Sequence, residues 1–140
     1  MSSKPQYLLD TNIISELVRN PHGRLKDQIA LVGEEAVCTS IIVSSELRFG
    51  AEKKGSKKIR SQLEAILSAI EILPFQELAD RQYATLRCQL EKAGTPIGPN
   101  DMLVAAQAIS QGLILVTANF KEFSQVPGLA VENWIELKRE

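Results

Sequence analysis

Three acidic residues stand out because the predicted elements of the chain would bring them into one crevice. Asp10 follows the apolar run at residues 7–9, Glu46 lies within a stretch of helical periodicity, and Asp101 opens a later helical stretch. Oxygen ligands without histidine or cysteine suit Mg²⁺, for which Mn²⁺ can substitute. Such an ion can activate water and stabilise the charge that develops on phosphorus. The three acids therefore predict a metal site at which an activated water attacks a phosphate ester.

The position of these acids follows from the elements around them. In open α/β sheets, ligands gather outside the carboxyl ends of the strands. Residues 10–12 follow the first predicted strand, residues 117–119 follow the strongest one, and Asp101 opens the helix entered from the Pro-Gly-Pro loop at 95–99. Glu46 comes four residues after Ile42, which puts it on the inward face of its helix. We expect the acids to share one crevice.

Acidic groups that face one another resist ionisation unless a cation lies between them. Thr11, Asn12 and Thr117 are expected to hold the carboxylates through hydrogen bonds, as metal sites require. Ser44 is a weaker candidate for that role. For Asn12, capping of the following helix is as well supported as a role at the metal site. Capping is also the alternative to metal binding for Asp10.

The remaining pattern predicts an α/β fold. Short apolar strands alternate with helices, which favours a parallel sheet covered on both faces. The predicted strands are 7–9, 36–39, 113–117 and 129–134, with 72–73 as a strand or a connector; the predicted helices are 24–32, 42–54, 57–70, 76–93 and 100–111, together with one after residue 12 and a short one after 119. Ser40 is a predicted cap and Gly112 a predicted helix end.

Composition narrows the class of protein. The 140 residues fit a single domain spanning 1–140, and a content of 44% hydrophobic and 24% charged residues is that of a folded chain. The net charge of −1 means that any contact with nucleic acid must come from a local patch. The cations between Lys53 and Arg60 could track an RNA backbone or form a solvated loop. Arg48 and Arg87 are further candidates.

Other reactive side chains have simpler interpretations. Cys38 and Cys88 are predicted to be buried, reduced thiols. The single histidine, His22, lies in a polar turn and is not expected to act as a base. The start of the sequence lacks an apolar signal core, and no apolar run is long enough to span a membrane. We therefore expect a cytoplasmic protein.

Four segments together resemble the PIN-domain nucleases and, within them, the VapC toxins of bacterial toxin–antitoxin pairs. They are residues 8–12 (Leu-Leu-Asp-Thr-Asn), 44–51 (Ser-Ser-Glu-Leu-Arg-Phe-Gly-Ala), 98–108 (Gly-Pro-Asn-Asp-Met-Leu-Val-Ala-Ala-Gln-Ala) and 115–123 (Leu-Val-Thr-Ala-Asn-Phe-Lys-Glu-Phe). Each segment alone is a weak signal, whereas the four in this order are specific. The resemblance covers nearly the whole chain. It implies a PIN-like three-layer α/β/α sandwich around a mostly parallel sheet of about five strands.

The resemblance also implies a site. Asp10, Glu46 and Asp101 would be the metal-binding acids, with Asn119 at a fourth position where many members of the family carry aspartate. Asn119 could still orient a metal-bound water through its amide oxygen. Glu122, one helical turn later, is the alternative source of the missing charge.

The implied activity is endonucleolytic cleavage of RNA that leaves a 5′-phosphate and a 3′-hydroxyl, with transfer RNA, particularly the initiator species, among the targets. The implied partners are a second copy of the chain and a VapB-type antitoxin, which would cover the acidic groove and bind operator DNA. One alternative is a haloacid-dehalogenase-type phosphotransferase with Asp10 as nucleophile, although that chemistry usually needs a second aspartate where Asn12 stands. The other is an inactive binding module, which only Asn119 supports.

Overall fold

Five short strands form one sheet in the order β3-β2-β1-β4-β5, and every neighbouring pair is parallel. In this computed structural model, residues 5–135 are described. The strands are β1 (Tyr7–Leu9), β2 (Val37–Ser40), β3 (Glu71–Leu73), β4 (Ile114–Val116) and β5 (Val131–Glu132). The parallel sheet of five strands confirms the predicted fold class. Residues 1–4, where we expected no signal core, lie outside the described part of the chain.

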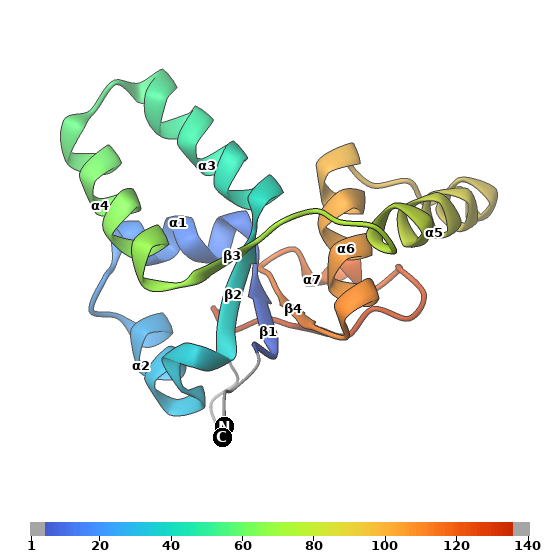
Figure 1. The fold of residues 1–140 in the computed structure, drawn as a ribbon, viewed down its shortest axis with the longest axis horizontal. Helices are drawn as coiled ribbons and strands as arrows, with labels where there is room; N and C mark the ends of the chain where they lie inside the picture. Colours follow the sequence, from blue (N-terminus) through green and yellow to red (C-terminus); the bar gives the residue numbers. More distant parts are fainter. Residues whose placement is uncertain (1–4, 136–140) are drawn as a thin grey trace.

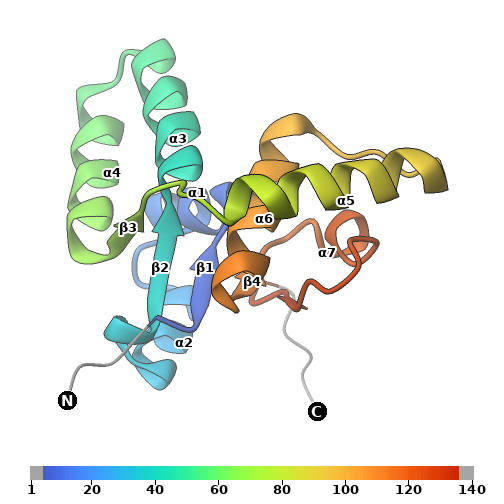
Figure 2. The same cartoon turned by 45° about the vertical axis from the view of Figure 1, so that its right-hand side comes forward.

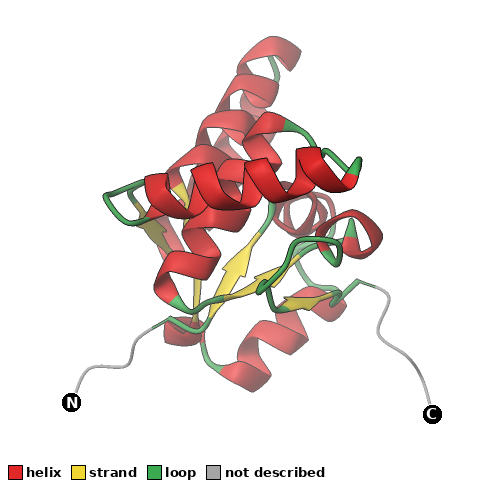
Figure 3. Cartoon of the chain, turned by 90° about the vertical axis from the view of Figure 1, so that its right-hand side faces the viewer, coloured by secondary structure: helices red, strands yellow, loops and turns green. Residues whose placement is uncertain are grey.

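Helices cover both faces of this sheet. They are α1 (Thr11–Arg19), α2 (Arg24–Val32), α3 (Ile41–Lys54), α4 (Lys57–Ala69), α5 (Ala79–Ala93), α6 (Pro99–Gln111) and α7 (Phe120–Phe123), with a 3₁₀ turn at Glu34–Ala36. Figure 1 shows α1, α2 and α4 on one side of the sheet and α5, α6 and α7 on the other, and in Figure 3 the strands lie between the helical layers. The helices α3 and α4 run side by side and extend beyond the sheet (Figure 2). In the described residues, no helix is long and apolar enough to cross a membrane.

The strands are short and apolar because both of their faces are covered. All four residues of β2 are buried, as are Leu8, Leu9, Leu115 and Val116 in the neighbouring strands. The predicted helix ends are also present. The Ser40 hydroxyl accepts a hydrogen bond from the Ile42 N–H, and Gly112 ends α6 with a φ of +67°.

Two predictions about helix α5 are wrong. The helix begins at Ala79 and not at residue 76, because Leu78 adopts a φ of +84° that is incompatible with a helix. Cys88 is exposed and not buried, because α5 buries Leu86 and Leu90, and a residue midway between them faces away from that side. Cys38 is buried in β2 as predicted, and burial raises the pKa of its thiol to about 12.

The remaining differences concern the lengths of the strands. Residues 71–73 form a true strand, β3, paired with β2, whereas the last strand shrinks from the predicted 129–134 to 131–132. A buried glutamine that the sequence did not single out holds β3. The Gln107 side chain accepts a hydrogen bond from the Ser40 hydroxyl, and it donates to the carbonyls of Leu73 at 3.1 Å and Pro74 at 3.0 Å. Gln107 thus ties α6 to the edge of the sheet.

Candidate functional site

Asp10 occupies the junction between β1 and α1. Its N–H donates to the carbonyl of Val116 at 2.9 Å, so the residue continues the pairing of β1 with β4 before the chain turns into the helix. The residue is only 3% exposed. Burial raises the pKa of the Asp10 carboxyl; the Thr117 hydroxyl opposes this rise, and the charge of Glu46 adds to it. Asp10 is therefore a buried acid for which a nearby cation would be favourable.

Thr117, at the end of β4, connects the two strand ends of the site. Its buried hydroxyl donates to Asp10 Oδ2 at 2.8 Å and accepts the N–H of Asn119 at 3.0 Å. Asn12 has a different contact from the one expected, since its Oδ1 accepts the N–H of Ala118 at 2.8 Å. Asn12 therefore fixes the loop after β4, whereas Thr117 contacts the acid itself.

Replacing Thr117 by Val should weaken the site without removing a carboxylate. The variant keeps the shape of the side chain and loses both hydrogen bonds of the hydroxyl. Residues that hold a metal ligand in place typically contribute about 10- to 100-fold to metal affinity or activity, and we expect a loss in that range. Isothermal titration with Mn²⁺ measures it, with the exposed Thr85→Val on α5 as control. Equal Mn²⁺ affinity in Thr117→Val and wild type would contradict this role.

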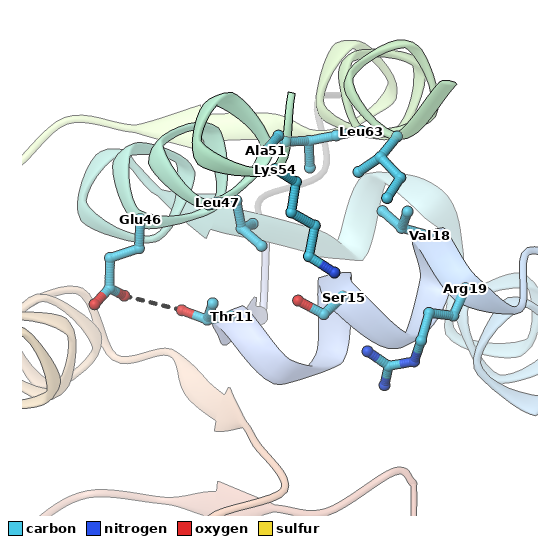
Figure 4. A pocket seen from close by; sticks show the side chains of 11 residues that line it. Thr11, Ser15, Val18, Arg19, Glu46, Leu47, Ala51, Lys54 and Leu63 are labelled. Carbon is cyan, nitrogen blue, oxygen red and sulfur yellow. Dashed lines mark hydrogen bonds between the residues drawn. The ribbon is translucent and has the colours of Figure 1, made fainter. Parts of the chain in front are cut away.

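Glu46 projects from α3 toward α1 and α6. Its Oε1 accepts a hydrogen bond from the Thr11 hydroxyl at 3.0 Å, which Figure 4 shows, and its Oε2 accepts one from Asn100 Nδ2 at 2.9 Å. The side chain is half-buried and faces inward, as its helical position predicted. The neighbouring Ser44 donates to the carbonyl of Ile41 at 3.1 Å and thus serves its own helix.

Asp101 lies in the first turn of α6, and its carboxyl is partly buried. The pKa of this carboxyl rises to about 6, mainly through burial, and further through the negative charges of Asp10, Glu122 and Glu46. Gly98 leaves the space that the carboxylate occupies, since a Cβ there would lie 3.3 Å from Asp101 Oδ2. The acids predicted from the sequence thus act on one another electrostatically across three elements.

The acids of this site have no cationic partner among the described residues. The ion pairs found there are Arg19–Glu16, Arg48–Glu64, Arg60–Glu52 and Arg87–Glu91. In the same residues, no three His, Cys, Asp or Glu side chains are close enough together to enclose one ion. The donor set still fits Mg²⁺, because this ion keeps several waters and takes only one or two carboxylates directly.

A groove of about 290 Å³ extends from Glu46 between α1, α3 and α4. Polar residues from two helices line it, namely Thr11, Ser15 and Arg19 on α1, and Glu46 and Lys54 on α3 (Figure 4). Its apolar wall includes Val18, Leu47 and Leu63. Of the cations considered for an RNA track, Lys54 reaches this groove, whereas Arg48 and Arg87 pair with acids of their own surroundings.

The comparison with known proteins decides the family. The family model described as "PIN domain" matches residues 7–129. This chain belongs to the PIN domain family. Ribonuclease VapC2 of Rickettsia felis is 38% identical over 130 residues, which cover 91% of this chain and 97% of that protein. The tRNA(fMet)-specific endonuclease VapC of Salmonella typhimurium is 32% identical, with coverages of 92% and 98%. Within the PIN domain family, the chain is thus a VapC relative, as the sequence motifs indicated.

Solved structures agree with this assignment. The DNA-bound VapBC of Salmonella typhimurium aligns with a TM-score of 0.85 at 33% identity, covering 93% of this chain and 98% of that one. VapBC2 of Rickettsia felis, bound to a DNA fragment from its promoter, also gives 0.85, at 36% identity and coverages of 91% and 98%. The three-layer PIN arrangement predicted from the motifs is therefore confirmed.

Two residues are candidates for the fourth position that the motifs implied. Asn119 is exposed, precedes α7, and is held through its N–H by Thr117. Glu122 lies on α7, and its charge is one of those that raise the pKa of Asp101. Glu122 is thus one of the negative charges that act on Asp101, and Asn119 contributes none. Asn100, which donates to Glu46, is the site residue that the sequence motifs did not single out; its place beside Asp101 indicates nearness to the site but not which acid it contacts.

Proposed function

We propose that this protein is a divalent-metal-dependent endoribonuclease and the toxin of a type II toxin–antitoxin pair. The observation that carries the proposal is the group of acids around Asp101, where burial first and negative neighbours second raise the pKa of the Asp101 carboxyl to about 6, and where no cation among the described residues pairs with the acids. Such perturbed acids are typical of functional sites. The relatives named ribonuclease VapC2 and tRNA(fMet)-specific endonuclease supply the reaction class.

Within this proposal, Asp10, Glu46 and Asp101 would hold Mg²⁺, one or two of them directly and the rest through waters of the ion, and Mn²⁺ could replace it. When bound there, the ion would supply an activated water and would stabilise negative charge on phosphorus. Thr117 orients Asp10 through its hydroxyl, and Thr11 does the same for Glu46. Asn119 offers an amide oxygen to a water at the edge of the site. Cleavage leaves a 5′-phosphate and a 3′-hydroxyl.

Transfer RNA, in particular the initiator species, is the substrate we propose, because a relative that matches over 92% of this chain is named a tRNA(fMet)-specific endonuclease. Lys54 and Arg19 are cations on the groove that begins at Glu46, and Arg19 is also paired with Glu16 at 2.7 Å. They lie two helical turns, or about 12 Å, from Thr11 and Glu46 along their helices. This spacing allows them to contact the RNA backbone while the acids act on one phosphate.

The partner we propose is a VapB-type antitoxin, since the solved relatives include VapBC and FitAB complexes bound to DNA. Its C-terminal segment would cover the groove and present an Arg or Lys to the acids, a pairing that charge-assisted hydrogen bonds favour. Operator DNA would be bound through the antitoxin. We further propose a homodimer that acts in the cytoplasm.

The haloacid-dehalogenase-type alternative loses its support. The chain matches the PIN domain over residues 7–129, and the residue two positions after Asp10 is Asn12, which holds the Ala118 N–H. An inactive PIN binding module is the remaining competitor. It differs from an enzyme in one measurable respect, since it would bind metal without cutting RNA.

The test is to incubate purified protein with total RNA, with Mg²⁺ or with a chelator, and to map the new 5′ ends. We expect discrete cleavage sites that carry 5′-phosphates and that disappear with the chelator. Cleavage that persists in the chelator would contradict the metal dependence. Metal binding without cleavage, under Mg²⁺ and Mn²⁺ alike, would select the binding module. In cells whose growth is inhibited by this protein, co-expression of the antitoxin from the adjacent small gene should restore growth, and the two proteins should purify as a complex.

A further inference from the structure

Asn100 makes the one side-chain hydrogen bond that joins α3 to the first turn of α6 in the described residues. Its Nδ2 donates to Glu46 Oε2 at 2.9 Å, across 54 positions of the sequence. The residue stands directly before Asp101 in α6, so the two side chains leave the same helical turn. Asn100 therefore connects the acid on α3 to the helix that carries the acid on α6.

The two hydrogen bonds of Glu46 leave it able to bind a cation. Each carboxylate oxygen has two lone pairs, and Thr11 and Asn100 use one on each oxygen. Both donors are neutral, so neither competes with a metal ion as a Lys or Arg would. Together they fix two points of a planar group, which determines where its free lone pairs point.

We propose that Asn100 is a positioning residue of the metal site, which acts by orienting the carboxylate of Glu46 toward Asp101. The inference rests on the proposed metal-dependent function. It goes beyond that function because it gives a role to a residue outside the set of acids. The side-chain amide of Asn100 would align α3 with α6 at the site. Thr11 secures the same carboxylate from α1, so Glu46 is held from two helices at once.

A structural role alone is a weak explanation for this contact. Asn100 is exposed, and a hydrogen bond in contact with solvent contributes little to stability because water can replace either partner. Groups that hold a metal ligand, by contrast, typically affect metal affinity by about 10- to 100-fold. Loss of Asn100 should therefore change Mn²⁺ affinity much more than it changes the melting temperature.

The experiment is a double-mutant cycle read out by Mn²⁺ affinity in isothermal titration, with wild type, Asn100→Ala, Glu46→Gln and the double variant. We expect Asn100→Ala to bind Mn²⁺ about 10-fold more weakly than wild type. In the Glu46→Gln background the same change should alter affinity by less than about twofold, because Asn100 acts through Glu46. Gln111→Ala, an exposed amide at the other end of α6, is the matched control and should bind as wild type does.

The outcomes separate this inference from the function on which it rests. If wild type binds Mn²⁺ and Asn100→Ala binds it equally well, the positioning role is wrong and the metal site stands. Equal losses in both backgrounds would also overturn it, since Asn100 would then act independently of Glu46. If wild type binds no Mn²⁺, the proposed metal site fails and the inference fails with it. Thermal melts without metal confirm that each variant is folded.

Discussion

Asp10→Asn is expected to reduce RNA cleavage by more than about 100-fold while the protein remains folded. Indirect partners of metal ligands already contribute up to about that factor, and Asp10 is proposed as a ligand itself. The fold should tolerate the change, because the amide oxygen of Asn can still accept the Thr117 hydrogen bond, which the carboxylate accepts at 2.8 Å. The variant also removes a buried charge whose raised pKa shows that the surroundings disfavour it. Single-turnover cleavage of RNA and thermal melts measure the two effects.

The control for this variant is Asp27→Asn. Asp27 is an exposed aspartate in the first turn of α2 and lies outside the group of acids that act on Asp101. It undergoes the same chemical change and should leave cleavage at the wild-type rate. If Asp10→Asn cleaves RNA at the wild-type rate, the active site lies elsewhere in the molecule. A folded Asp10→Asn that also loses Mn²⁺ binding would assign its defect to the metal.

The parts of the site that could be predicted are those fixed by strand ends. Asp10 and Thr117 each follow an apolar strand, and parallel strands end at the same edge of a sheet, so local pattern predicts that both residues lie at this edge; their direct contact follows because β1 and β4 are neighbours. Glu46 was placed on the inward face of its helix from spacing alone. Its partner Asn100 was not, because that contact depends on how α3 and α6 approach each other.

Other errors have the same physical origin. The late start of α5 depends on a positive φ at Leu78, which a leucine rarely adopts and which its sequence does not announce. The exposure of Cys88 depends on which face of α5 packs onto α6, and an apolar neighbourhood in the sequence does not specify that face. Glu122 was already a candidate for the site from its place one helical turn after Asn119, whereas its electrostatic effect on Asp101 depends on where the fold places α7.

Asp101→Asn should abolish cleavage and also make the metal-free protein more stable above pH 6. In the folded protein the pKa of Asp101 is about 6, above its ordinary value of 3.8. Between these values the folded state binds more protons than the unfolded state, so stability falls as the pH rises through this range. Above pH 6 the full penalty for the ionised group is present. The Asn variant has no such penalty, and its melting temperature should decline less between pH 4 and pH 7.

Two opposing effects determine how much stability the Asp101→Asn variant gains. A carboxylate in the first turn of α6 interacts favourably with the helix dipole, and Asn loses this contribution of about 0.3–1 kcal/mol. The raised pKa nevertheless means that burial and the charges of Asp10, Glu122 and Glu46 outweigh every group that favours ionisation.

Mg²⁺ should reverse the order of stability of wild type and Asp101→Asn at pH 7.5, because it stabilises only a protein whose acids bind it. Melts of wild type and Asp101→Asn with chelator and with Mg²⁺ test this. A wild type that is the more stable protein in chelator at pH 7.5 would show that the acids do not repel one another as the fold implies.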